Sequence, residues 1–161
     1  MFAINVEGRW VVLYEYKVKI TRVIDGDTVD ADVDLGFDIF VKDRIRLMAI
    51  DTPESRTRNK SEKILGLASK KRLKELCAMH KGKIILKTSK EGKGKFGRIL
   101  GSIYAEGSEV SFNDILISEG HARPYFGGSK SEQGEWTTEI DGKLMRWTAS
   151  GYVEFIKSEY V

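Results

Sequence analysis

In the first third of the chain, hydrophobic and polar positions alternate with a period of two, which is the pattern of half-buried strands. The clearest runs are Tyr16–Ile20 and Val29–Leu35, and a third run extends over Ile39–Ile50. Gly26, flanked by Asp25 and Asp27, lies after the first run, and Gly36-Phe37-Asp38 follows the second; both compositions favour turns. This segment therefore predicts a meander of about three strands, each with one buried face.

After the third strand, the hydrophobic positions recur at the spacing of a helix. Pro53 lacks a backbone donor, so we expect it to end the third strand and provide a bend there. Ser61 is the expected N-cap of a helix that continues to about His80, with Glu62 in its first turn. The apolar positions on one side of this helix are Ile64, Leu65, Ala68, Leu73, Leu76 and Cys77.

Two more strands are predicted over Lys83–Thr88 and Arg98–Ala105. Ser111 or Asn113 could cap a short helix after them, and Gly120 would end that helix in a left-handed conformation. Five short strands with one helix inserted and another following favour a partly open barrel over a parallel sheet. Periodicity alone does not choose among small barrel topologies.

The pattern becomes irregular after Tyr125, where Trp136–Val161 predicts either a hairpin turning at Asp141-Gly142 or a capping helix. A chain of 161 residues suits one domain. We expect a domain over residues 1–128 and a C-terminal extension over residues 129–161 that packs on it.

Charge is distributed unevenly along the chain. The net charge is only +3, but residues 56–98 hold fifteen basic and three acidic side chains, whereas the first 55 residues hold seven basic and eleven acidic ones. Such asymmetry suits a site where carboxylates bind a cation and nearby Lys and Arg attract a polyanion. Charge alone favours the simpler interpretation, a solvated helix face and a lysine-rich loop.

The rare residue types exclude several classes of site. Cys77 is the single cysteine, so neither an internal disulfide nor a cysteine-based zinc cluster can form. His80 and His121 are the only histidines and lie far apart in sequence, which disfavours a histidine-based centre. The apolar run Trp10–Tyr14 is too short for a signal or membrane segment, so we expect a soluble, cytoplasmic protein without membrane association.

Three short segments place chemically active side chains at the ends of predicted strands. The first, Asp25-Gly26-Asp27, taken alone favours a turn over a metal site. The second runs from Arg46 to Glu54. A strand would put Arg46 and Asp51 on opposite faces, so a bend must bring them together.

The bend that Pro53 offers would also free the Thr52 carbonyl to face a cation, and hard divalent ions prefer carboxylate and carbonyl oxygens. A strand end with a surface ion pair is the alternative interpretation. The third segment is Gly94–Arg98, in which glycines allow close backbone approach and Arg98 presents a fork suited to phosphate oxygens.

In this order and spacing, the three segments resemble the staphylococcal nuclease family, over roughly Val18–Tyr125. Ile103–Gly107 and Gly120–Ala122 extend the compound motif. The resemblance implies an α+β, mainly β, fold: a five-stranded OB-type barrel with about three helices. The tail after Gly127 does not match the family pattern.

The resemblance also implies one calcium ion, Ca2+, at the rim of the barrel. In that picture the Asp27 and Asp51 carboxylates and the Thr52 carbonyl hold the ion, and Asp25 is a nearby or water-mediated partner. Calcium rather than magnesium follows from the resemblance alone, because these ligand types suit either ion.

The chemistry that the resemblance implies is phosphodiester hydrolysis of DNA and RNA, leaving 3′-phosphate ends. Glu54 would align or deprotonate the attacking water, while Arg46 and Arg98 would bind the phosphate and stabilise charge in the transition state. Single or frayed strands are the expected substrates, and a monomer is the expected state. A substrate-binding role is implied for three further residues: Lys95, Phe96 and Tyr125.

Phe96 departs from the family pattern, because the family usually has tyrosine there; stacking would persist without the phenolic hydrogen bond. Two other classes of function remain. The chain could be a catalytically weak nucleic-acid-binding module, or a structural or calcium-buffering barrel. The presence of both carboxylates, the glutamate and both arginines favours the nuclease.

Overall fold

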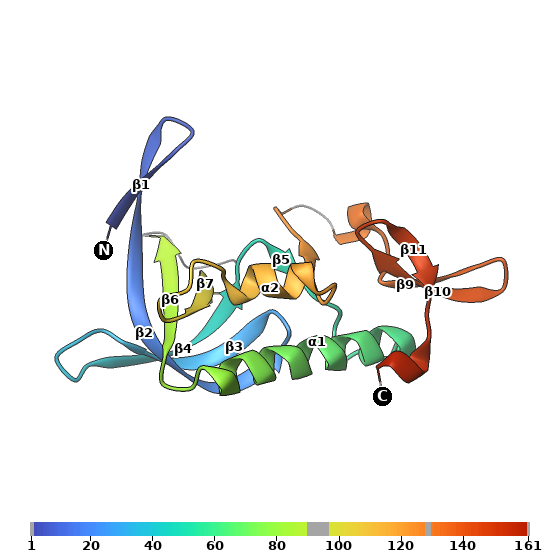
Figure 1. Cartoon of the computed structure of the whole chain (residues 1–161), viewed down its shortest axis with the longest axis horizontal. Coiled ribbons are helices and arrows are strands. Elements are labelled where there is room, and N and C mark those ends of the chain that lie inside the picture. Colours follow the sequence, from blue (N-terminus) through green and yellow to red (C-terminus); the bar gives the residue numbers. More distant parts are fainter. Residues whose placement is uncertain (1, 90–96, 128–129, 161) are drawn as a thin grey trace.

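The computed structural model describes residues 2–89, 97–127 and 130–160 (Figure 1). Its centre is a barrel whose strands follow in space the order β2 (Arg9–Asp25), β3 (Thr28–Asp34), β4 (Phe40–Leu47), β7 (Ile99–Ala105) and β6 (Ile84–Ser89). The β4–β7 pair is parallel, and the other neighbours are antiparallel. The mainly β, five-stranded barrel is confirmed.

The barrel is closed rather than partly open, and the length of β2 is the reason. This strand has 17 residues. Its segment Val18–Asp25 pairs with β3, whereas Leu13–Val18 pairs with β6 and closes the barrel. The start of β2 extends beyond the barrel and pairs with β1 (Phe2–Val6) as a projecting hairpin (Figure 1).

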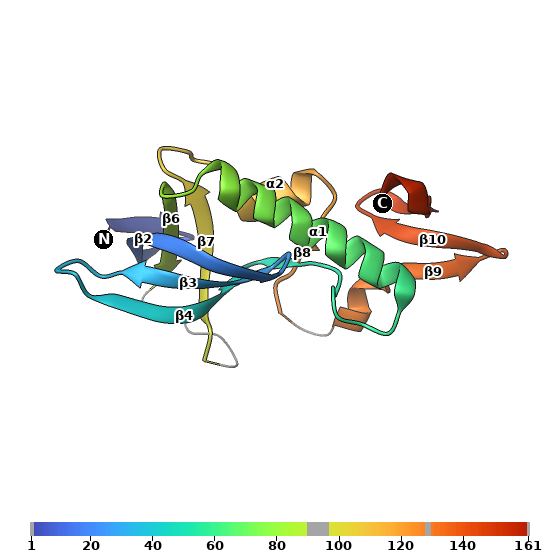
Figure 2. The same ribbon diagram turned by 90° about the horizontal axis from the view of Figure 1, so that it is seen from below.

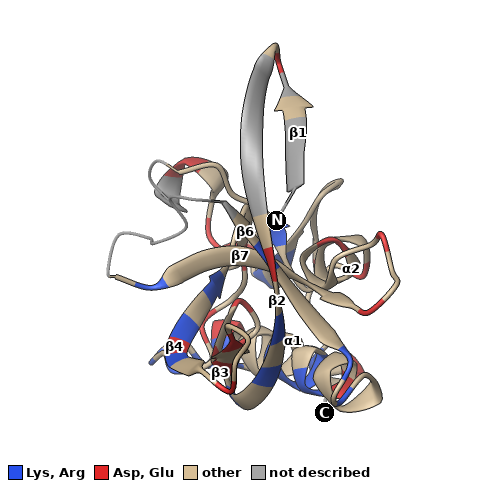
Figure 3. Cartoon of the chain, turned by 90° about the vertical axis from the view of Figure 1, so that its left-hand side faces the viewer, with Lys and Arg blue, Asp and Glu red and all other residues tan. Residues whose placement is uncertain are grey.

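Alternation along β3 directs its apolar side chains into the core and its carboxylates outward. Val29 and Val33 are buried, while Asp30 faces Arg44 of β4, with Oδ1 and Nε 2.8 Å apart. The Arg44 hydrogen bond holds the pKa of Asp30 below its ordinary value. Basic residues of β4 and β2 are therefore paired with acidic residues of β3 (Figure 3), so these strands do not form a uniformly basic face.

The long helix α1 (Lys60–Met79) packs against β2 (Figure 2). Asn59, not Ser61, is its N-cap: the Asn59 carboxamide accepts the Glu62 N–H at 3.0 Å. The predicted cap was wrong because two residues with similar capping preference are only two positions apart. Ser61 Oγ instead lies 2.8 Å from Thr137 Oγ1 in the tail.

The second helix, α2 (Phe112–Ser118), begins after Ser111, whose hydroxyl accepts the N–H of Asp114, and is followed by Gly120 at φ +79°. The resemblance implied about three helices, whereas the described residues form two α-helices and two short 3-10 turns. Within this described part of the chain, no helix combines the length and apolar content needed to cross a membrane.

The third predicted strand is interrupted. β4 ends at Leu47, Ala49 adopts a left-handed conformation with φ +64°, and β5 (Ile50–Asp51) then begins. The expected bend therefore exists, but it lies at Ala49 instead of Pro53. After the bend, β5 pairs with β8 (Arg123–Pro124), a connection that carries Asp51 away from the barrel wall.

The tail forms a three-stranded sheet: β9 (Thr137–Ile140), β10 (Lys143–Thr148) and β11 (Gly151–Glu154). The first two strands make a hairpin that turns at Asp141-Gly142, where both residues have positive φ. The hairpin alternative is thus confirmed. This C-terminal sheet lies beside the first turns of α1 (Figure 2).

Candidate active site

The turn between β2 and β3 holds Asp27 in a fixed orientation. Its carboxylate accepts the Thr28 hydroxyl at 2.9 Å and the Thr52 N–H at 3.2 Å, and only 7% of the residue is exposed. Gly26 is required because α1 approaches it: a Cβ there would lie 2.7 Å from Ser69 Cβ. The Asp-Gly-Asp segment therefore forms a turn and also fixes the buried carboxylate of Asp27.

The bend at Ala49 brings Arg46 and Asp51 to the same place. Arg46 Nη2 lies 3.3 Å from Asp27 Oδ2 and 3.9 Å from Asp51 Oδ1. Arg46 Nη1 donates to the Leu47 carbonyl at 2.7 Å, which fixes the guanidinium against its own strand. Two carboxylates, one from the turn between β2 and β3 and one from β5, thus converge on one guanidinium.

Asp51 is almost fully buried, with 1% exposed, and a second arginine compensates its charge. Arg123 Nη2 lies 3.5 Å from Asp51 Oδ2 because the β5–β8 pairing places the two residues opposite each other. Arg123 is not among the site residues predicted from the sequence. Its only signal was its position directly after the Gly120–Ala122 motif.

The donor set at this point fits a hard divalent cation. Asp27 and Asp51 offer carboxylate oxygens close to one another, and Thr52 follows with its carbonyl. Thr52 is buried, and its Oγ1 has no hydrogen-bond partner among the described residues. Those residues contain no cluster of three His, Cys, Asp or Glu side chains arranged for a metal, so backbone oxygens and water would have to complete a coordination shell.

The Asp25 carboxylate fixes the segment after β5. It accepts both the hydroxyl of Ser55 and its N–H, the latter at 3.3 Å. Ser55 was also missed by sequence analysis, since a lone serine beside a proline carries no specific signal. The exposed Glu54 directly precedes this anchored residue, so its backbone is held while its side chain faces solvent.

α1 holds the same segment from the other side. A Cβ at Gly66 would lie only 2.3 Å from the Glu54 carbonyl oxygen and 2.7 Å from the Ser55 nitrogen. Both neighbours are backbone atoms, which cannot rotate away. Gly66 is therefore the position that lets the helix approach the Glu54 segment.

We expect Gly66→Ala to lower the free energy of unfolding by about 1–3 kcal/mol, as overpacking commonly does. Intrinsic helix propensity predicts the opposite sign, a gain of about 1 kcal/mol. Urea unfolding distinguishes the two outcomes. Lys71→Ala is a suitable control, because Lys71 is exposed on the same helix and its replacement should change stability by no more than about 0.5 kcal/mol. A Gly66→Ala protein more stable than the parent would contradict the close contact.

A hollow of about 720 Å³ gathers most of the predicted residues. Its lining includes Asp25, Asp27, Arg46, Glu54, Arg98 and Tyr125. Asp51 and Thr52 instead line an adjacent cavity of about 170 Å³, which Glu54 also borders. Tyr125 is placed by its own N–H, which donates to the Ala49 carbonyl at 2.9 Å.

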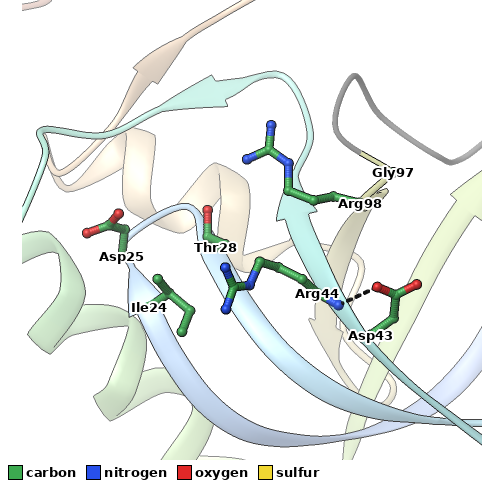
Figure 4. Close-up of a pocket in the computed structure, with 7 residues that line it drawn as sticks. All are labelled: Ile24, Asp25, Thr28, Asp43, Arg44, Gly97 and Arg98. Atoms are coloured by element: carbon green, nitrogen blue, oxygen red, sulfur yellow. Dashed lines mark hydrogen bonds between the residues drawn. The ribbon is translucent and has the colours of Figure 1, made fainter.

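A second hollow of about 510 Å³ adjoins the first and shares Asp25, Thr28 and Arg98 with it. Figure 4 shows Arg44 and Arg98 extending toward this space, with Asp25 across from them. Arg98 therefore borders both hollows. Lys95 and Phe96 lie outside the described residues.

Comparison with known proteins gives a consistent picture. Residues 44–141 match the family model described as staphylococcal nuclease homologue, a range that includes Arg46–Glu54 and Arg98 and extends into the tail. The SPbeta prophage-derived endonuclease YokF and the endonuclease YncB of Bacillus subtilis (strain 168) are each 32% identical over 146 residues, 84% of this chain. The thermonuclease of Staphylococcus intermedius is 36% identical over 107 residues, 66% of this chain. The matched regions cover 45%, 64% and 58% of these relatives, so the chain spans about half to two-thirds of their lengths.

Proposed function

Because this chain belongs to the staphylococcal nuclease family, we propose that it is an endonuclease that hydrolyses phosphodiester bonds of DNA and RNA, depends on calcium and leaves 3′-phosphate ends. One observation carries the proposal: the Arg46 guanidinium lies within 4 Å of both the Asp27 and the Asp51 carboxylates. Glu54 and Arg98 border the hollow beside them. A polyanion whose charge grows during reaction is stabilised by cationic groups, here the two guanidiniums together with a cation that the carboxylates would hold.

Asp27, Asp51 and the Thr52 carbonyl would hold the calcium ion, which when bound supplies Lewis-acid polarisation of a phosphate oxygen. Arg46 and Arg98 bind the remaining phosphate oxygens and stabilise the charge that develops on them. Glu54 accepts a proton from water at the open side of the hollow, where its exposed carboxylate has room for a solvent molecule.

Substrate binding depends on backbone charge and stacking, neither of which reads sequence closely. Tyr125 and the 87% exposed Phe126 line the large hollow, where an unpaired base could stack on them. Single or frayed strands fit this arrangement better than an intact duplex, whose bases are already stacked. Lys95 and Phe96 are proposed to extend the contact, and the protein is proposed to act as a monomer.

Tyr125→Ala is expected to weaken binding of single-stranded DNA at least about fivefold, since stacking contributes about 1–3 kcal/mol per base. Tyr125→Phe keeps the ring and should bind like the parent protein. Fluorescence anisotropy with a short oligonucleotide, in EDTA to prevent cleavage, measures the difference. Equal affinity of the alanine variant would remove Tyr125 from the binding surface.

The proposed function is tested by digestion of single-stranded and duplex DNA and RNA in calcium, magnesium or EDTA, followed by end-group analysis. Calcium-dependent cleavage that leaves 3′-phosphate ends is the expected result. Salt-sensitive binding of single strands without cleavage in either metal would contradict it and identify a binding module instead.

A further inference from the structure

The guanidinium of Arg123 lies on an aromatic platform that the tail provides. Its central carbon is 4.1 Å from the ring centroid of Trp136 and 5.5 Å from that of Trp147. The two indoles meet edge to face, and the backbone N–H of Trp147 donates to the backbone carbonyl of Trp136 at 2.8 Å. Trp136 directly precedes β9 and Trp147 belongs to β10, so the C-terminal sheet fixes both rings.

Arg123 also links the tail to Asp51 through polar contacts. Nη1 donates to the Gly134 carbonyl at 2.9 Å, while Nη2 lies 3.5 Å from Asp51 Oδ2. The Gly134 backbone is itself confined, because a Cβ there would lie 2.8 Å from the Tyr152 hydroxyl oxygen, and Tyr152 donates to the Glu135 carbonyl. Arg123 is 3% exposed and therefore has little freedom to move.

We propose that Arg123 is a positioning residue. The C-terminal sheet holds it against Asp51, and this contact sets the cation affinity of the site to which Asp51 belongs. The inference rests on the proposed function, in which Asp51 binds calcium. A buried carboxylate needs a fixed partner to keep its orientation, and partners of this kind typically change metal affinity by about 10- to 100-fold when removed.

Two possible roles for Arg123 predict opposite changes in calcium affinity when the residue is replaced. A positive charge beside a cation site repels the ion, so a guanidinium that acted by charge alone would make Arg123→Met bind calcium more tightly. A guanidinium that positions Asp51 makes the same variant bind more weakly. Trp136→Leu adds a test without any change of charge, because it removes only the platform under Arg123.

The experiment is calorimetric titration of the whole protein with Ca2+ in the absence of substrate. Arg123→Met and Trp136→Leu are each expected to weaken binding by about 10- to 100-fold. Trp136→Phe retains an aromatic face and should stay close to the parent protein. Arg72→Met is the matched control, since Arg72 pairs with Glu75 and Glu119 on the helical side of the molecule. Thermal unfolding in EDTA confirms that each variant is folded.

The outcomes separate this inference from the function on which it rests. A parent protein that binds no calcium would overturn both. A parent protein that binds calcium, with Arg123→Met and Trp136→Leu binding equally well or more tightly, would overturn the positioning role alone. If Trp136→Leu does not fold, the opposite changes in calcium affinity predicted for Arg123→Met still decide the question.

Discussion

Glu54→Gln is expected to lower kcat by about 10²- to 10⁴-fold, the usual contribution of a positioned general base. The amide has nearly the same shape as the carboxylate but cannot take a proton from water. Because Ser55 is bound to Asp25, the backbone next to Glu54 should stay in place. KM should therefore change little.

Single-turnover cleavage of a labelled single strand at saturating calcium measures this effect directly. Glu62→Gln is the matched control, because Glu62 borders the smaller cavity together with Glu54 but lies in the first turn of α1. Turnover of Glu54→Gln equal to that of the parent protein would exclude Glu54 as the base.

Arg46→Ala is expected to lower kcat/KM by about 10²- to 10³-fold, as loss of one transition-state donor commonly does. It should also destabilise the calcium-free protein by about 3–5 kcal/mol, because the buried Asp27 and Asp51 carboxylates lose a shared partner. Calcium should restore part of this stability, since it would bind the same carboxylates.

Steady-state kinetics and thermal unfolding, each with calcium and with EDTA, test both parts. Lys42→Ala serves as the control: Lys42 also belongs to β4 and pairs with an aspartate, Asp32, but it is exposed and borders neither hollow. An Arg46→Ala protein with normal stability in EDTA and normal cleavage would contradict the role of this guanidinium.

Local pattern was sufficient for the five barrel strands and the two helices, because alternation in segments such as Val29–Leu35 reports directly which face is buried. It was less informative about where elements start and bend. The bend at Ala49 could not be placed, since alanine has no special tendency toward positive φ and the neighbouring Pro53 gave a stronger signal.

The candidate site was predictable to the extent that it is local in sequence. Asp27, Arg46, Asp51 and Glu54 lie in two short motifs, and the structure brings them together as the motifs suggested. The contact of Asp51 with Arg123 was not predictable. It depends on the pairing of two strands that have only two residues each and lie far apart in the sequence. No periodicity extends over so few residues.

The β5–β8 pairing also determines when the site is completed during synthesis. A chain leaves the ribosome from its N-terminus, so both carboxylates, Arg46 and Glu54 emerge well before Arg123 and the tryptophans that support it. Until those later residues appear, Asp51 lacks its fixed partner. The site is therefore incomplete until the segment that holds Arg123, Trp136 and Trp147 has been synthesised, well after the motifs that hold its carboxylates.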